Sequence, residues 1–424
     1  MNRLVIGVLG IALCAPVVAV AQELTVDEFV ATALEQSPAL GAARTDIDAA
    51  RGRLVEAGLR PNPMVGSSRL EMLDGPDTQT MVEVQWPLDL FRRQARVTAG
   101  RQDLEATSLS VADRERLLAA MVREQAGRAL EAQRSLDIVR DVLAVDRQLL
   151  MVIEARVREG ATPRLELDIL QVEVQRAEAQ DVLQAADVET SLIDLRALAG
   201  LPPQGTTTLA GSLEEAVRVG PETRPTDASG PEVVERRADV RAAVARVGLA
   251  EAQIAQVRRE GWLDATVVGE YGRMTTGFPQ RAFDDGGALV PIEGLFNNLR
   301  VGVMVSVPMW DRNQGSVAAA SAARARAQHD VEANRLAASA EIAAAETRAR
   351  AAQRAVELYA AGAREQARRN LDVVREAYEL GRSSLVDVLD EQRRYLDVEA
   401  AYTQALSAAY QAHTAVRRAT GDVK

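Results

Sequence analysis

The feature that most constrains this chain is an internal repeat, because the same order of motifs occurs twice. Residues 82–88 read VEVQWPL and are followed by RRQARV, while residues 303–309 read VMVSVPM and are followed by RNQGSV. Farther along, Gly160 precedes an LDIL motif and Gly381 precedes a VDVL motif. The two halves are therefore predicted to share one plan of helix, strand, strand, very long helix and long helix.

The composition between the two copies marks their boundary. Residues 201–234 contain several Pro and Gly residues, which favour turns and loops. We therefore place the first repeat at 22–200, a linker at 201–234 and the second repeat at 235–424.

Four segments alternate between apolar and polar residues with a period of two. The predicted strands are about 64–73, 79–88, 264–274 and 298–309. Segments of about ten residues with one apolar face are typical of strands in an outer-membrane β-barrel. Strands of a soluble sandwich are the alternative, but little else in the chain could cover an apolar sheet face.

Four strands cannot close a barrel, and an open sheet edge cannot face lipid. If these strands span a membrane, several copies must share one barrel. Each strand pair is also predicted to be a hairpin, so all the helices should lie on one side of the membrane. For an exported protein of this kind, that side is the periplasm.

The predicted helices are unusually long. No Pro occurs between Arg93 and Glu159, and apolar residues recur there every seven positions, which indicates coiled-coil packing. At 1.5 Å per residue such a helix extends roughly 100 Å. The long helices are expected at about 93–159, 163–199, 313–380 and 384–420.

The first 21 residues have the pattern of a secretory signal peptide. Arg3 is followed by an apolar stretch from Leu4 to Leu13, and Ala19-Val20-Ala21 forms a small-x-small cleavage site. An uncleaved anchor is the alternative, but this stretch is short for a membrane span. Cys14, the only cysteine, lies inside this segment, and Leu13 before it does not suit acylation. The mature chain is then expected to contain no disulfide.

Composition argues against nucleic acid binding and catalysis. The net charge of −11 is spread along the chain, and no Lys/Arg stripe is present to neutralise phosphates. The two histidines have no neighbours at metal-ligand spacing, and we find no phosphate-binding Gly loop, nucleophile elbow or metalloprotease motif. We therefore expect no enzyme activity, no cofactor and no metal site.

Three further motifs carry a resemblance to a known family. They are SPAL at 37–40, AGLRPNP at 57–63 and RADVRAA at 237–243. With the signal peptide, the two repeats and the Asp-containing turn after Gly381, the mature chain resembles the TolC family of outer-membrane efflux proteins. It is most similar to the branch that serves heavy-metal and drug pumps of the resistance-nodulation-division (RND) type.

This resemblance implies a mainly α protein with a membrane β-barrel. Three chains with four strands each would form a twelve-stranded barrel, and their helices would form a periplasmic coiled-coil tunnel. The tunnel would be closed at its tip until a periplasmic adaptor and an inner-membrane pump engage it.

Candidate functional residues lie after Gly381. Asp387 and Asp390 are three positions apart and so share one face of a helix. Taken alone they are two solvated carboxylates, but the resemblance places them in acidic rings at the periplasmic aperture, where they would attract cations. In the first repeat Asp168 takes the matching place, and Glu166 is expected to face the same way.

The resemblance also implies an Arg that helps to hold the aperture shut. Arg382 stands one position before the usual place of that Arg, which Ser383 occupies here, so either Arg382 or Arg164 could form the closing salt bridge. Gly160 and Gly381 stand where helical hairpins reverse, which suits Gly on local grounds. Under the resemblance they are the tips that contact the adaptor.

The predicted function is the exit duct of a tripartite pump that exports small solutes such as metal cations or drugs. The outer-membrane channel of a type I protein secretion system is an alternative with the same fold. A periplasmic coiled coil without a pore is a second alternative, but it leaves the four alternating segments and the strand ends at Pro87 and Pro308 unexplained.

Overall fold

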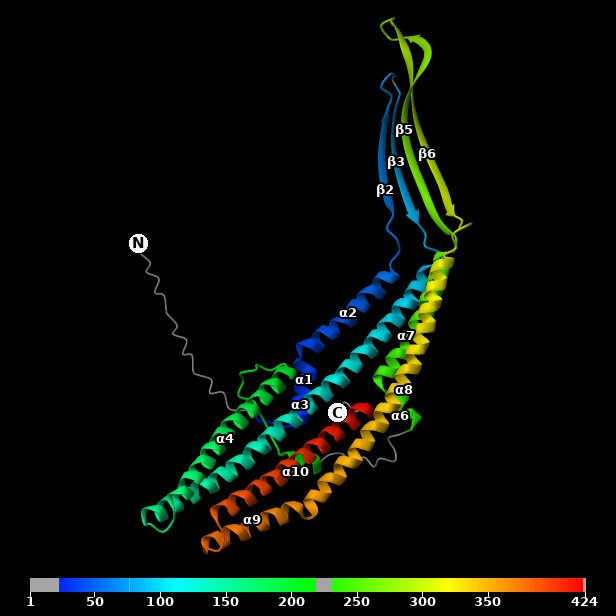
Figure 1. Ribbon diagram of the computed structural model, residues 1–424. Helices are drawn as coiled ribbons and strands as arrows, with labels where there is room; N and C mark the ends of the chain where they lie inside the picture. Colours follow the sequence, from blue (N-terminus) through cyan, green and yellow to red (C-terminus); the bar gives the residue numbers. More distant parts are fainter. Residues whose placement is uncertain (1–22, 76, 219–229, 422–424) are drawn as a thin grey trace, which may run out of the picture. The chain divides into compact units, whose positions relative to one another are not determined.

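A computed structural model describes residues 23–75, 77–218 and 230–421. The predicted signal peptide and Cys14 lie outside the described residues, as does part of the predicted linker. Figure 1 draws the helices and strands of the chain, which divides into two compact units. Unit 1 comprises Met1–Pro38, Leu117–Pro225 and Ala343–Lys424, and unit 2 comprises Ala39–Arg116 and Thr226–Ile342. Each unit therefore takes segments from both repeats.

The helices have the following bounds: α1 Val26–Gln36, α2 Pro38–Gly58, α3 Arg93–Arg158, α4 Arg164–Leu198, α5 Leu213–Arg218, α6 Pro231–Arg236, α7 Ala238–Glu260, α8 Gln314–Leu358, α9 Arg364–Glu379 and α10 Leu385–Thr420. A π-helical segment, η1, spans Tyr359–Ala363 between α8 and α9. The strands are β1 Glu23–Leu24, β2 Met64–Glu71, β3 Thr78–Pro87, β4 Thr208–Leu209, β5 Asp264–Phe283 and β6 Leu289–Ser306.

Unit 2 contains a four-stranded antiparallel sheet in the order β2-β3-β5-β6. Its register places apolar residues of all four strands on one face, because Val65 pairs with Val84, Val84 with Gly269 and Gly269 with Val301. The exposed large apolar side chains of this face, here called the apolar belt, are Val65, Val82, Val84, Trp86, Tyr271, Leu299, Val301, Val303 and Val305. The opposite face carries polar side chains, among them Glu83, Glu270 and Arg300.

The second hairpin is longer than the alternating pattern predicted. β5 runs to Phe283 and β6 begins at Leu289, so both strands extend well past the predicted ranges. The added stretches contain Pro279, Pro291 and the two glycines Gly277 and Gly294, and the pairing shifts register between Phe278 and Arg281. This irregularity hides the period of two that a sequence pattern relies on.

All four strands join their helices at the same end of the sheet. The register aligns Met64 with Gln85, Pro87 with Thr266 and Asp264 with Ser306. These pairs lie next to the junctions with α2, α3, α7 and α8. Both hairpins therefore reverse at the far end of the sheet, and the helices leave from the near end, as two hairpins require.

Buried ion pairs join the helices of unit 2. Arg237, which is 3% exposed, lies immediately before α7. Its Nη2 is 2.7 Å from Asp239 Oδ2 and 2.8 Å from Glu341 Oε2 of α8. Arg237 and Asp239 belong to the RADVRAA motif, so this motif ties the start of α7 to α8.

In unit 1 the long helices are α3 from Leu117 onward, α4, α9 and α10. Gly127 of α3 packs directly against the ring of Tyr410 of α10, and a Cβ at that position would lie 2.4 Å from Tyr410 Cδ1. Glu399 of α10 is buried and pairs with Arg134 of α3 at 2.9 Å and Arg364 of α9 at 2.8 Å. The predicted helix 313–380 is thus interrupted by η1 near this ion-pair network, with Gly362 outside helical geometry.

Among the described residues, no helix combines the length and apolar character that a transmembrane helix requires.

Candidate functional site

The α3–α4 and α9–α10 turns end their helices in the same way. Gly160 and Gly381 have φ angles of +74° and +69°, the left-handed region that favours glycine. Gly160 donates to Val157 O at 3.1 Å, and Gly381 donates to Tyr378 O at 2.9 Å. In each turn the next residue donates to the carbonyl five positions earlier, so both helices end in a Schellman motif.

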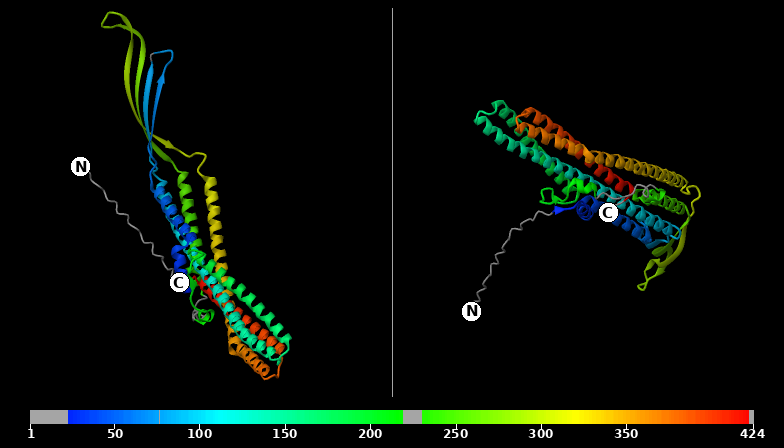
Figure 2. Two further views of the ribbon diagram at one scale, coloured as in Figure 1. Left: turned by 90° about the vertical axis from the view of Figure 1, so that its left-hand side faces the viewer. Right: turned by 90° about the horizontal axis from the view of Figure 1, so that it is seen from below.

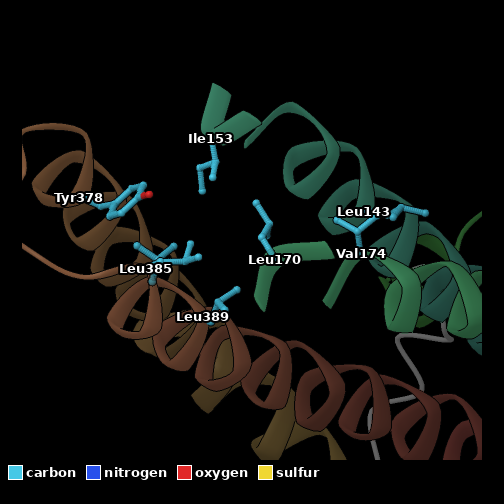
Figure 3. Packing of buried hydrophobic residues seen from close by; sticks show 8 residues of the cluster. Leu143, Ile153, Leu170, Val174, Tyr378, Leu385 and Leu389 are labelled. Atoms are coloured by element: carbon cyan, nitrogen blue, oxygen red, sulfur yellow. The ribbon is translucent and has the colours of Figure 1, made fainter. Parts of the chain in front are cut away.

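The two hairpins lie side by side in unit 1, with their turns at one end (Figure 2). A cluster of buried side chains packs them together just behind the turns (Figure 3). Ile153 and Leu170 come from the α3–α4 hairpin, and Leu385 and Leu389 come from α10. Each is less than one-tenth exposed, so burial of apolar surface holds the hairpins in contact.

Tyr378 of α9 adds a polar link to this apolar contact. Its hydroxyl donates to Glu166 Oε2 of α4 at 2.9 Å, while its ring is buried in the cluster. Burial raises the pKa of Tyr378 to about 12, and the bond to the Glu166 carboxylate acts in the same direction. Glu166 was among the predicted site residues and Tyr378 was not, because in a sequence a tyrosine at an apolar helix position is indistinguishable from a packing residue.

Asp387 has a local role that the sequence analysis did not assign. Its Oδ2 accepts hydrogen bonds from Ser384 N at 2.8 Å and from Ser384 Oγ at 2.7 Å, forming a capping box at the start of α10. The hydrogen bond from the Ser384 backbone lowers the pKa of Asp387, and the hydroxyl adds to this effect. In the sequence, a Ser followed three residues later by an acidic side chain could have indicated this capping box.

Asp390 is exposed and lies 3.3 Å from Arg393 on the same helix. Arg393 also reaches Glu173 of α4, with Nη2 2.6 Å from Glu173 Oε1. Near the turns, an ion pair between the two hairpins of one chain therefore comes from Arg393, which was not among the predicted site residues.

The remaining predicted site residues do not meet within one chain. Asp168 is exposed and lies 4.0 Å from Arg164 of its own helix. Among the described residues, Arg382 forms no salt bridge, and nothing joins Asp168 to Asp387 or Asp390. Neither proposed closing arginine thus bridges the two hairpins of a single chain. Asp168, Asp387 and Asp390 are exposed at these turns, whereas Glu166 is half-buried and accepts the hydrogen bond from Tyr378.

Sequence comparison relates both repeats to one known family. The family model described as "Outer membrane efflux protein" matches residues 30–201 and 231–422, one match for each repeat. The cobalt-zinc-cadmium resistance protein CzcC of Cupriavidus metallidurans is 23% identical over 403 residues, which cover 94% of this chain and 90% of the relative.

Solved structures share the fold at low sequence identity. CusC superposes with a TM-score of 0.73 at 17% identity, covering 94% of this chain and 92% of CusC. The CmeC outer membrane channel of Campylobacter jejuni gives 0.74 at 13% identity, covering 99% and 94%. The MtrE outer membrane channel of Neisseria gonorrhoeae gives 0.72 at 18% identity, covering 94% and 89%.

Fold and family together define the class of protein as an outer-membrane efflux channel. The chain belongs to the outer membrane efflux protein family, so the resemblance to the TolC family is confirmed. Its function is that of an efflux channel of the kind used by tripartite pumps.

Proposed function

We propose that three copies of this chain form the exit duct of a tripartite pump, working with a periplasmic adaptor and an inner-membrane RND-type pump. The duct would export small solutes, metal cations first among them. The observation that carries this proposal is the four-stranded sheet, which has an apolar face and two unpaired edges.

The sheet edges account for the oligomer. β2 and β6 each pair on one side only, and their unpaired N–H and C=O groups cannot face lipid. Strand direction alternates across β2-β3-β5-β6, so β6 of one copy runs antiparallel to β2 of the next. Closure by copies of the same chain therefore continues the pattern without a break, and three copies give twelve strands.

The two faces of the sheet suit a channel in the outer membrane. The apolar belt would contact lipid, and the opposite face would line the lumen. Arg300 Nη1 lies 3.1 Å from Glu270 Oε2 on that face, and Glu83 is the residue opposite Glu270 on β3. These are charges that a water-filled interior accepts and lipid does not.

The tips would form the periplasmic aperture. In a trimer the exposed Asp387, Asp390 and Asp168 would repeat three times around one axis. Glu166 would keep its hydrogen bond from Tyr378. Such rings attract cations. Gly160 and Gly381 would contact the adaptor, because a side chain added at either position would meet open space in this chain.

The identity of the cargo is proposed from the relative. CzcC is described as a cobalt-zinc-cadmium resistance protein and aligns with nearly the whole chain. We therefore propose divalent cobalt, zinc or cadmium as the first cargo to test.

A deletion strain, complemented with the wild-type gene, provides the test. We expect the deletion to lower the tolerated concentration of cobalt, zinc and cadmium, with a smaller change for dyes and antibiotics. Loss of dye and antibiotic tolerance alone would reassign the cargo to drugs. Unchanged tolerance together with loss of a secreted protein from the medium would instead support a type I secretion channel.

A further inference from the structure

A cavity of about 380 Å³ lies between α3, α4 and α10 in unit 1. This volume is within the range of small-molecule sites. Ile138 and Val142 of α3 and Leu389 and Leu396 of α10 give it apolar walls.

One wall of the cavity carries a buried carboxylate. Asp146 of α3 is 2% exposed, and its Oδ2 accepts a hydrogen bond from Gln392 Nε2 at 2.9 Å. Gln392 is oriented by Arg375 of α9, whose Nη2 donates to its Oε1 at 3.1 Å. Asp146 Oδ1 is buried and has no hydrogen-bond partner among the described residues. A buried carboxylate oxygen without a hydrogen-bond donor lowers the stability of the fold. A ligand that donates a hydrogen bond to Asp146 Oδ1 would remove this penalty.

The other charged groups around the cavity are already neutralised or lie in solvent. Glu173 pairs with Arg393 at 2.6 Å and with Arg176 at 3.9 Å. Asp397 is exposed at the rim. Asp146 forms no salt bridge among the described residues, and Arg375 is hydrogen-bonded to its partner Gln392 rather than to Asp146 itself. Asp146 is therefore the buried carboxylate of this cavity that has no direct cationic partner among the described residues.

We propose that this cavity binds a small amphipathic cation, namely a primary amine with an aromatic or aliphatic body, whose ammonium group donates to Asp146 Oδ1. An ammonium group brings three donors and a positive charge to a single carboxylate. The apolar walls would cover the body of the ligand. A metal ion suits the cavity less well, because no group of three or more His, Cys, Asp or Glu residues in the described ranges is placed to hold one. All the lining residues belong to one chain, so the proposal does not rest on the identity of the exported cargo.

The site predicts a coupling to protons. Burial raises the pKa of Asp146, the hydrogen bond from Gln392 and the charge of Arg375 oppose that rise, and Glu173 adds to it. Since an ammonium ion binds the ionised carboxylate, binding should release a proton when Asp146 starts out protonated. Affinity should therefore fall as the pH is lowered through the raised pKa of Asp146.

The test uses the purified full chain in detergent and two probes that share an indole body. Tryptamine carries an ammonium group, and tryptophol carries a hydroxyl group in its place. Titration calorimetry should show tryptamine binding at least about tenfold more tightly, since hydrogen bonds to charged groups are the stronger ones. Asp146→Asn should remove that preference, while Asp397→Asn at the rim should keep it.

Equal binding of the two probes, or an unchanged preference in Asp146→Asn, would overturn the proposal. A second measurement on the wild-type protein does not depend on the variant folding. In mildly acidic solution the tryptamine binding enthalpy should differ between buffers of different ionisation enthalpy, because a proton is released. A binding enthalpy that is the same in both buffers, with an affinity that does not depend on pH, would also overturn it.

Discussion

At the scale of single residues, Tyr378 matters because its hydroxyl adds a polar link to the apolar cluster that packs the two hairpins together behind their turns. Tyr378→Phe would keep the ring in the cluster and remove the bond to Glu166. We expect the free energy of unfolding to fall by about 1 kcal/mol, the usual net value of one hydrogen bond. We also expect a higher single-channel conductance in planar bilayers.

The matched control for this change is Tyr395→Phe. Tyr395 is also part-buried on α10, but its hydroxyl makes no hydrogen bond among the described residues. It should leave the conductance unchanged. Equal effects of the two substitutions would mean that the Tyr378–Glu166 bond does not restrain the hairpins.

The raised pKa of Tyr378 sets the alkaline limit of this link. Its folded-state pKa of about 12 exceeds the ordinary value of 10.0, so the neutral form is favoured in the folded chain. The stabilisation is complete below the ordinary value and is lost as the pH rises toward the folded-state value. The free energy of unfolding of Tyr378→Phe, measured over this pH range, should therefore fall less than that of the wild-type protein.

Asp387 and Asp390 have separable roles, although they share one helix face. Asp387→Asn combined with Asp390→Asn would remove both charges, while the amide oxygen introduced at position 387 can still accept from the Ser384 backbone. We expect reduced cation selectivity in bilayer recordings, because the rings lose their charge. Ser384→Ala is the control, since it weakens the helix cap and keeps both carboxylates. Selectivity lost in Ser384→Ala but kept in the double variant would contradict the assignment.

At the scale of helices, the same Gly→Ala substitution is expected to have opposite effects on stability at Gly127 and at Gly52. Gly127→Ala would put a Cβ 2.4 Å from the buried ring of Tyr410, so α3 and α10 would have to separate. We expect destabilisation of about 1–3 kcal/mol, as for other overpacked cores. Gly52→Ala on α2 meets nothing within 4 Å and should stabilise the chain by about 0.5–1 kcal/mol. Thermal denaturation followed by helical circular dichroism would measure both, and equal shifts would show that the α3–α10 contact is not tight.

The elements also show where sequence patterns succeed. The predicted helix 93–159 is realised as α3, Arg93–Arg158, because the absence of Pro and the heptad positions act locally along one helix. The predicted helix 313–380 is divided by η1, beside the ion pairs of Glu399 with Arg134 and Arg364. Those partners lie far apart in sequence, so the pattern of one helix carries no sign of them.

At the scale of the whole molecule, the proposed trimer places one face of β6 against lipid and the other in the water-filled lumen. Val303→Arg would place a charge in the apolar belt of every copy; such a charge costs about 2–4 kcal/mol at the bilayer midplane and less toward the interfaces. Met304→Arg, the next residue, lies on the opposite face and should be accepted by the lumen. We expect heat-modifiable trimers to be lost for Val303→Arg and kept for Met304→Arg. Equal yields from outer membranes would argue against the assigned faces.

The architecture was readable from the chain because its signals are periodic or repeated. Alternation in β3 and β6, heptads in α3 and Gly at positions 160 and 381 each reflect a local requirement of backbone or burial. The same features predict that four strands in a membrane need further copies of the chain, since an open edge cannot face lipid.

The contacts of the candidate site were decided by tertiary structure alone. Tyr378 with Glu166, Arg393 with Glu173 and the unpaired oxygen of Asp146 all depend on which residues of distant helices face each other. A hydrogen bond forms only within about 3 Å. Periodicity identifies the face of a helix, but it does not set the register between two helices, and only their packing brings a donor and an acceptor to that distance.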